Sequence, residues 1–147
     1  ASMEPNYHDY EYLIIDEITY RFNEPKRGEV VVFRYPPDPK QFFIKRVIGL
    51  PGESVKIEDG DVYIAKPGLE FEALQEDYLA SGTKTIGQAD VTLSENQYFL
   101  LGDNRAASLD SRVFGPIDKT AIIGRTLLRG WPLTKAGLLI EEMDYNL

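Results

Sequence analysis

Short hydrophobic runs alternate with turn-forming residues along most of the chain. The runs are rich in Val, Ile, Phe and Tyr, which strands favour, and Gly, Pro, Asn or Asp residues separate many of them. This pattern predicts strands over residues 12–15, 29–33, 42–48, 55–57, 62–64, 98–101 and 121–128. We therefore expect a mainly β fold, an antiparallel and barrel-like sheet with loop excursions and little helix.

One hairpin can be predicted from its turn. Asp59 and Gly60 stand between the runs 55–57 and 62–64. An Asp-Gly pair favours a type I′ turn because both central residues need a positive φ. The surrounding acidic residues lack the spacing of a twelve-residue calcium loop. We predict a solvated hairpin turn and no metal site.

Loops and domain limits are indicated by proline and glycine. Pro36, Pro37 and Pro39 separate two predicted strands, and the stretch at about 65–90 mixes Pro and Gly with acidic residues and shows no clean period. We interpret residues 1–147 as one domain with a loop-rich excursion at 65–90. A short helix is predicted over 134–143. The sequence contains no apolar run of the length that spans a bilayer, so we expect any membrane anchor to lie outside it.

Composition narrows the classes of partner. The 147 residues are 43% hydrophobic, enough for one core. They carry 16 Lys and Arg against 24 Asp and Glu, and the formal net charge of −8 would repel a phosphate backbone. Nucleic acid is therefore not expected as a partner. The absence of cysteine excludes disulfides, thiolate metal sites and cysteine nucleophiles.

Lys45 is a candidate for chemistry because hydrophobic residues stand on both sides of it. Burial would disfavour its ammonium form, lower its pKa and make the amine a base near neutral pH. Strand alternation could equally direct the side chain to solvent. A serine nucleophile such as Ser2 needs a base, and the sequence offers Lys45 or His8, its single histidine. His8 lies in a polar stretch, and we expect it to be an exposed loop residue.

Ser2 itself has two simpler interpretations. A serine beside a chain end is ordinarily a solvated residue. An N-terminal nucleophile would use its own α-amine as base, but Ala1 precedes Ser2. Neighbouring motifs decide between these interpretations and a catalytic one.

Four segments carry those motifs, in this order: Ser2-Met3-Glu4-Pro5, residues 27–33, residues 45–53, and residues 102–112, which read Gly-Asp-Asn-Arg-Ala-Ala-Ser-Leu-Asp-Ser-Arg. Together they resemble the sequence boxes of type I signal peptidases, and the resemblance covers essentially the whole chain. It implies a serine endopeptidase with Ser2 as nucleophile and Lys45 as general base. Archaeal and endoplasmic reticulum relatives have a histidine at the lysine position, so the chain resembles the bacterial type.

The resemblance also implies supporting roles. Ser108 would orient the lysine amine, and Asp110 and Arg112, together with Arg46, would hold their segment against the lysine strand. Neither a cofactor nor a metal is implied. An extended substrate would pair with the chain near Lys45, and the residues expected to bind it are Met3, Phe42, Phe43 and Ile44.

The implied substrates are the signal peptides of secretory preproteins, cleaved after small residues at an A-x-A type site, and the implied location is the extracytoplasmic side of the bacterial cytoplasmic membrane. We expect some of the side chains of Met3, Pro5, Phe42 and Phe43 to be exposed together as an apolar patch that meets membrane lipid, with acidic residues gathered elsewhere, notably at 70–77 and 141–144. Two alternatives stay open. One is a catalytically weak relative that binds exported chains; the other is a self-cleaving repressor-type Ser-Lys peptidase, although the sequence shows no DNA-binding pattern.

Overall fold

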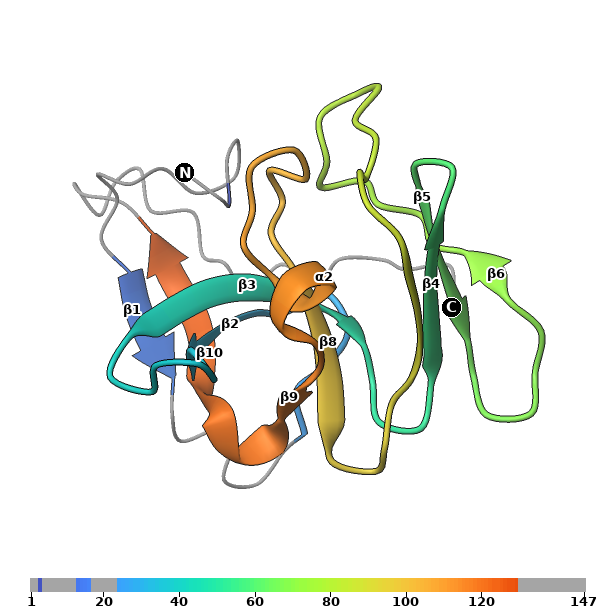
Figure 1. Ribbon diagram of the computed structural model, residues 1–147. Coiled ribbons are helices and arrows are strands. Elements are labelled where there is room, and N and C mark those ends of the chain that lie inside the picture. Colours follow the sequence, from blue (N-terminus) through green and yellow to red (C-terminus); the bar gives the residue numbers. More distant parts are fainter. Residues whose placement is uncertain (1–2, 4–12, 17–23, 130–147) are drawn as a thin grey trace.

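Two antiparallel sheets make up the fold in the computed structural model, which describes Met3, the backbone of residues 13–16 and 127–129, and residues 24–126 in full (Figure 1). The larger sheet has the strand order β1-β10-β2-β3-β8-β9, and the smaller has the order β6-β5-β4-β7. The strands are β1 (Leu13–Asp16), β2 (Val30–Arg34), β3 (Phe42–Gly49), β4 (Ser54–Glu58), β5 (Asp61–Ala65), β6 (Glu72–Ala73), β7 (Ala89–Thr92), β8 (Gln97–Leu101), β9 (Ile117–Asp118) and β10 (Ile122–Arg129).

All seven predicted strands are present, as β1, β2, β3, β4, β5, β8 and β10. The hairpin prediction is also confirmed, because β4 and β5 pair in register with Glu58 opposite Asp61. Asp59 and Gly60 have φ angles of 51° and 86° at the turn, as a type I′ turn requires. The mainly β prediction is therefore correct, although the two sheets stay open and form no closed barrel in the described part of the chain.

Five short elements were not predicted. Strands β6 and β7 lie in or next to the excursion, and they pair with β5 and β4 to complete the smaller sheet. The four-residue helix α2 (Ser111–Phe114) begins within the last motif, strand β9 follows it, and a 3₁₀ turn spans Lys119–Ala121. The helix predicted over 134–143 lies outside the described residues.

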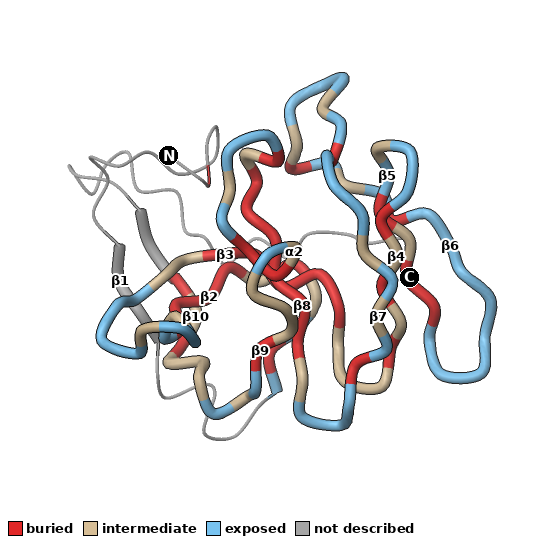
Figure 2. The backbone as a smooth tube through the Cα atoms, viewed as in Figure 1, coloured by how far each residue is buried: buried red, intermediate tan, exposed pale blue. Residues whose placement is uncertain are grey.

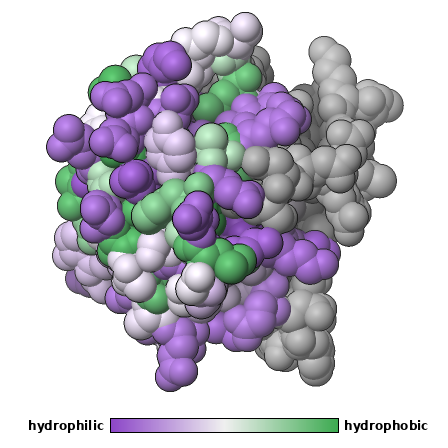
Figure 3. Space-filling model, turned by 90° about the vertical axis from the view of Figure 1, so that its right-hand side faces the viewer, coloured by the Kyte–Doolittle hydropathy of each residue, from purple (hydrophilic) through white to green (hydrophobic). Residues whose placement is uncertain are grey.

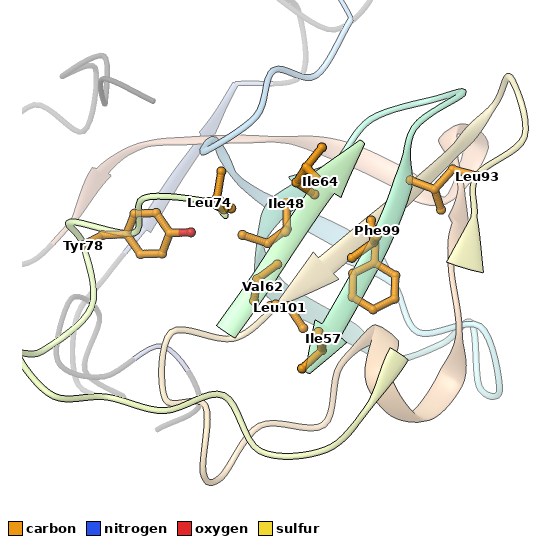
Figure 4. Close-up of a cluster of buried hydrophobic side chains, with 10 residues drawn as sticks. Ile48, Ile57, Val62, Ile64, Leu74, Tyr78, Leu93, Phe99 and Leu101 are labelled. Carbon is orange, nitrogen blue, oxygen red and sulfur yellow. The ribbon is translucent and has the colours of Figure 1, made fainter. Parts of the chain in front are cut away.

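The central strands of the larger sheet, β2, β3 and β8, are largely buried on both faces, which explains their continuous apolar runs. Neighbouring residues of β8 belong to different clusters: Tyr98 and Leu100 pack on one face, and Phe99 and Leu101 on the other. The second cluster lies between the two sheets (Figure 4) and consists of Ile48, Val55, Ile57, Val62, Ile64, Leu74, Tyr78, Leu93, Phe99 and Leu101. Strand β3 is exposed at its first residue, Phe42, and becomes buried over residues 45–49 (Figure 2).

Candidate active site

Lys45 lies in this buried part of β3. It is opposite Val31 in the β2–β3 pairing, and its side chain is 3% exposed. The ammonium nitrogen lies 5.6 Å from the centre of the Phe43 ring. Burial lowers the pKa of Lys45 from 10.5 to about 8; the charges of Asp110 and Asp103 oppose this shift, and that of Arg112 adds to it. Of the two interpretations of Lys45, the desolvated lysine is therefore correct.

The segment after β8 brings acidic and basic groups to Lys45. Asp110, which is fully buried, caps α2 and accepts a hydrogen bond from the Arg112 backbone N–H at 3.1 Å and from the Gly102 N–H at 3.0 Å. The Arg112 guanidinium donates to both carboxylate oxygens, at 2.9 Å and 2.8 Å. Burial raises the pKa of Asp110, but the hydrogen bonds from Arg112 and Gly102 outweigh it, so the net pKa lies below its usual value.

Ser108 lies in the turn between Gly102 and Asp110. Its hydroxyl oxygen is buried and has no hydrogen bond of standard geometry to any residue that the structure describes. The same hydroxyl helps to lower the pKa of the Asp110 carboxyl. A buried hydroxyl in this state has unused capacity to donate and accept.

Arg46 fixes the start of this turn to the lysine strand. Its Nε and Nη2 donate to the two carboxylate oxygens of Asp103 at 2.9 Å and 2.7 Å, and its Nη1 donates to the carbonyl oxygen of Gly28 at 2.9 Å. The expected function of Arg46 as a clamp between segment and strand agrees with this geometry. Its carboxylate partner is Asp103, which the sequence analysis did not single out, while Asp110 pairs with Arg112.

The residues expected to bind substrate differ in exposure. Phe42 is 54% exposed, Phe43 and Ile44 are partly buried, and Met3 is only 2% exposed. The Phe43 ring stacks on Tyr35 with centroids 4.4 Å apart. Met3 packs on Val30 and Ile44, and its sulfur accepts a hydrogen bond from the Asp103 N–H at 3.4 Å. Met3 is therefore a core residue and is not one of the side chains that could form an exposed apolar patch.

The acidic stretch at 70–77 is exposed at most but not all of its residues. Glu70, Glu72 and Asp77 are exposed, as expected for an acidic stretch, whereas Glu76 is partly buried and paired with Arg105. Over the smaller sheet the surface is largely hydrophilic, with hydrophobic residues scattered through it (Figure 3). Ser2, Pro5 and His8 lie outside the described residues.

Metal-binding clusters and membrane-spanning helices are both absent from the described residues. No group of three or more His, Cys, Asp or Glu side chains in that part of the chain is arranged to hold a metal ion. No helix there is long and apolar enough to cross a membrane.

Known proteins are similar to this chain in sequence and in fold. The family model for signal peptidase, peptidase S26, matches residues 1–131. "Probable signal peptidase I-2" of Synechocystis sp. is 39% identical over 150 residues, which cover 98% of this chain and 66% of that protein. Signal peptidase I of Leptolyngbya laminosa is 37% identical over 153 residues, which cover 98% of this chain and 71% of that protein. The chain thus spans roughly two thirds of the length of these relatives.

A solved structure agrees with these matches. The crystal structure of a signal peptidase I from Enterococcus faecalis V583 matches with a TM-score of 0.58 and 31% sequence identity, over 70% of this chain and 97% of that one. Family model, relatives and structure all indicate the same assignment. The chain belongs to the signal peptidase family, peptidase S26, a family of serine peptidases.

Proposed function

We propose that the chain is the catalytic part of an enzyme that removes signal peptides from secretory preproteins by a Ser2–Lys45 dyad. The observation that carries the proposal is the burial of Lys45, which lowers its pKa to about 8. A lysine with that pKa has a useful fraction of neutral amine near neutral pH and can take a proton from a serine hydroxyl. The matching family of serine peptidases supports the same chemistry.

The location of Met3 supports the assignment of Ser2 as the nucleophile. Met3 contacts Ile44, the neighbour of Lys45, and its sulfur bonds the backbone of Asp103, at the start of the turn that carries Ser108. Ser2 is the covalent neighbour of Met3. The packing of Met3 against the elements that carry the base is therefore what supports Ser2, its neighbour in sequence, as the proposed nucleophile.

The reaction would follow two half-steps. Lys45 takes the proton of the Ser2 hydroxyl while Ser2 Oγ attacks the scissile carbonyl carbon, and the Ser2 backbone N–H donates to the oxyanion. The C–N bond then breaks, the leaving amine receives the proton from Lys45, and the signal peptide stays as an ester on Ser2. Water, deprotonated by Lys45, hydrolyses the ester and restores the Ser2 hydroxyl. Ser108 orients the lysine amine, and Asp110, Arg112 and Arg46 hold the segment that carries it.

The substrate is proposed to bind as an extended strand beside residues 42–44, so that backbone hydrogen bonds give affinity and side-chain pockets give specificity. Partly buried Phe43 and Ile44 would line shallow pockets that fit small residues, and buried Met3 would form a wall behind them. Exposed Phe42 is the described residue of this group best placed to meet a lipid surface. This would suit a catalytic domain on the extracytoplasmic side of the bacterial membrane.

Substrate selectivity tests the function directly. For a preprotein with an Ala-x-Ala cleavage site, replacing the final Ala by Leu should lower kcat/KM by at least about 100-fold, because a shallow pocket excludes the larger side chain. The measurement is the rate of appearance of mature protein, with the cleavage point read by mass spectrometry. A matched control replaces the middle residue of the site by Leu and should change kcat/KM by less than about threefold. Equal kcat/KM for the parent substrate and the substrate with the final Ala replaced by Leu would contradict the proposed specificity. Absence of cleavage of the parent substrate would favour a relative that only binds exported chains.

A further inference from the structure

The loop-rich excursion reaches back to the turn that carries Ser108. Figure 1 shows the tip of the excursion, between β6 and β7, beside the loop that joins β8 to α2. Hydrogen bonds join the two segments: Arg105 of the turn donates to Glu76 and Thr85 of the excursion, and Arg112 donates to the Ile86 carbonyl oxygen at 2.9 Å. The excursion is therefore tied to the candidate site through side chains far apart in sequence.

Arg105 is the centre of this connection. Its side chain is only 1% exposed. Its Nε donates to the Gly102 carbonyl oxygen at 2.8 Å. Its Nη1 donates to Glu76 Oε1 at 3.0 Å and to Thr85 Oγ1 at 2.8 Å. Its Nη2 donates to the other oxygen of Glu76. Burial lowers the pKa of Arg105, but the hydrogen bond and the charge of Glu76 outweigh this effect, and the net pKa lies above its ordinary value. Glu76 is thus the anion that makes a buried cation tolerable in the turn.

Tyr78 links this pair to the clamp on the lysine strand. Its hydroxyl donates to Glu76 Oε2 at 2.6 Å, and its ring lies 4.1 Å from the Arg46 guanidinium carbon. Arg46 in turn holds Asp103 at the start of the turn. Arg112, which binds Asp110, also donates to the Arg105 carbonyl oxygen at 2.8 Å. Residues 102, 103, 105 and 112 of the last motif are therefore fixed by one connected network that includes the excursion.

We propose that Glu76 is a positioning residue for the peptidase reaction: through Arg105 it holds the turn so that Ser108 and Asp110 stay beside Lys45. This inference rests on the proposed function of Lys45 and Ser108. Glu76 has no described contact with Phe42, Phe43 or Ile44, so it should affect the chemical step more than substrate binding. Small misplacements of a catalytic group are enough to cost about 100-fold in rate.

The test compares two neighbouring carboxylates in the protein expressed from its complete gene. Glu76→Gln removes the charge that pairs with Arg105, whereas Asp77→Asn removes an exposed charge whose described side-chain bonds are to Gln75. We expect Glu76→Gln to lower kcat by about 10- to 100-fold with KM within about twofold of the parent value. Asp77→Asn should leave both constants within about twofold.

A double-mutant cycle separates positioning from a general loss of structure. If Glu76 acts through the turn that holds Ser108, Glu76→Gln should lower kcat less than about threefold when Ser108 is already alanine. An equal fractional loss in the Ser108→Ala background, or no larger loss for Glu76→Gln than for Asp77→Asn, would overturn the proposal. If the Glu76→Gln variant does not fold, the Tyr78→Phe variant takes its place in the same measurements. Tyr78→Phe deletes one hydrogen bond to Glu76 and keeps the aromatic ring over Arg46. A kcat for Tyr78→Phe equal to that of the parent would then overturn the proposal.

Failure of the proposed function would be recognised separately. In that case the parent protein would not cleave a preprotein, or Lys45→Met would cleave it at the parent rate. Failure of the positioning inference would instead appear as a Lys45-dependent enzyme that is indifferent to Glu76.

Discussion

Replacement of Lys45 by methionine is expected to lower kcat by about 10³- to 10⁴-fold while the protein stays folded, because it removes the general base and keeps a side chain of similar length. Lys56→Met is the matched control. Like Lys45, Lys56 lies on a strand and has its nitrogen near an aromatic ring, 5.7 Å from the centre of Tyr63. Unlike Lys45, it lies on β4 of the smaller sheet. The control should cleave preprotein within about twofold of the parent rate. Parent-like kcat for Lys45→Met would exclude Lys45 as the base.

The same substitution should also raise the stability of the protein near neutral pH. The folded-state pKa of Lys45, about 8, lies below its ordinary value of 10.5, so folding favours the neutral amine. The parent therefore loses stability as pH falls from 10.5 to 8, by about 3 kcal/mol, and does not regain it at lower pH. Methionine carries no such cost. Thermal unfolding at pH 7 should show a Tm for Lys45→Met equal to or above that of the parent, and a much lower Tm would mean that the activity loss reflects unfolding.

The second large effect is on stability and concerns the buried pair of Arg46 and Asp103. Both side chains are almost fully buried, so Asp103→Asn leaves the Arg46 charge without its anionic partner. Loss of one member of such a pair costs about 3–5 kcal/mol, which corresponds to a fall in Tm of roughly 10 °C for a chain of this size. The measurement is thermal unfolding followed by circular dichroism.

A surface pair provides the control for this effect. Asp61 and Lys84 are 3.8 Å apart, and their side chains are 55% and 67% exposed, so Asp61→Asn should change the free energy of unfolding by less than about 1 kcal/mol.

The double variant Arg46→Met with Asp103→Leu should recover at least half of the stability lost in Asp103→Asn, since it leaves no unpaired buried charge. Equal Tm values for Asp103→Asn and Asp61→Asn would contradict this account of the clamp.

The strands were predictable because burial on both faces leaves long apolar runs such as that of β8, and because Asp59-Gly60 is a specific turn signal. Strands β6 and β7 were not predictable in the same way. Their residues Glu72, Asp90 and Thr92 are polar and exposed, only Ala89 and Val91 of β7 pack against the cluster between the sheets, and the two strands pair with β5 and β4. Edge strands of this kind resemble loops in sequence.

The residues of the candidate site also differ in how far the sequence predicts them. Lys45 could be picked out because a charged residue inside an apolar run is unusual. Asp103, Arg105 and Glu76 could not, since a buried arginine or glutamate has no local sequence signature, and its partner lies 57 residues away for Arg46 and 29 for Arg105. The acidic stretch at 70–77 predicted exposure as a whole, and only the tertiary contacts distinguish Glu76 from exposed Asp77.

The most direct test of the Ser2–Lys45 dyad is covalent labelling by a serine-reactive penem, with the adduct mapped by tandem mass spectrometry and its rate followed from pH 6 to 10. The dyad predicts a single adduct on Ser2, formed at a rate that rises with pH and levels off above an apparent pKa of about 8, as Lys45 loses its proton. Lys45→Met should form it at least about 10³-fold more slowly. An adduct on another residue, or labelling of Ser2 at the parent rate without Lys45, would contradict the account.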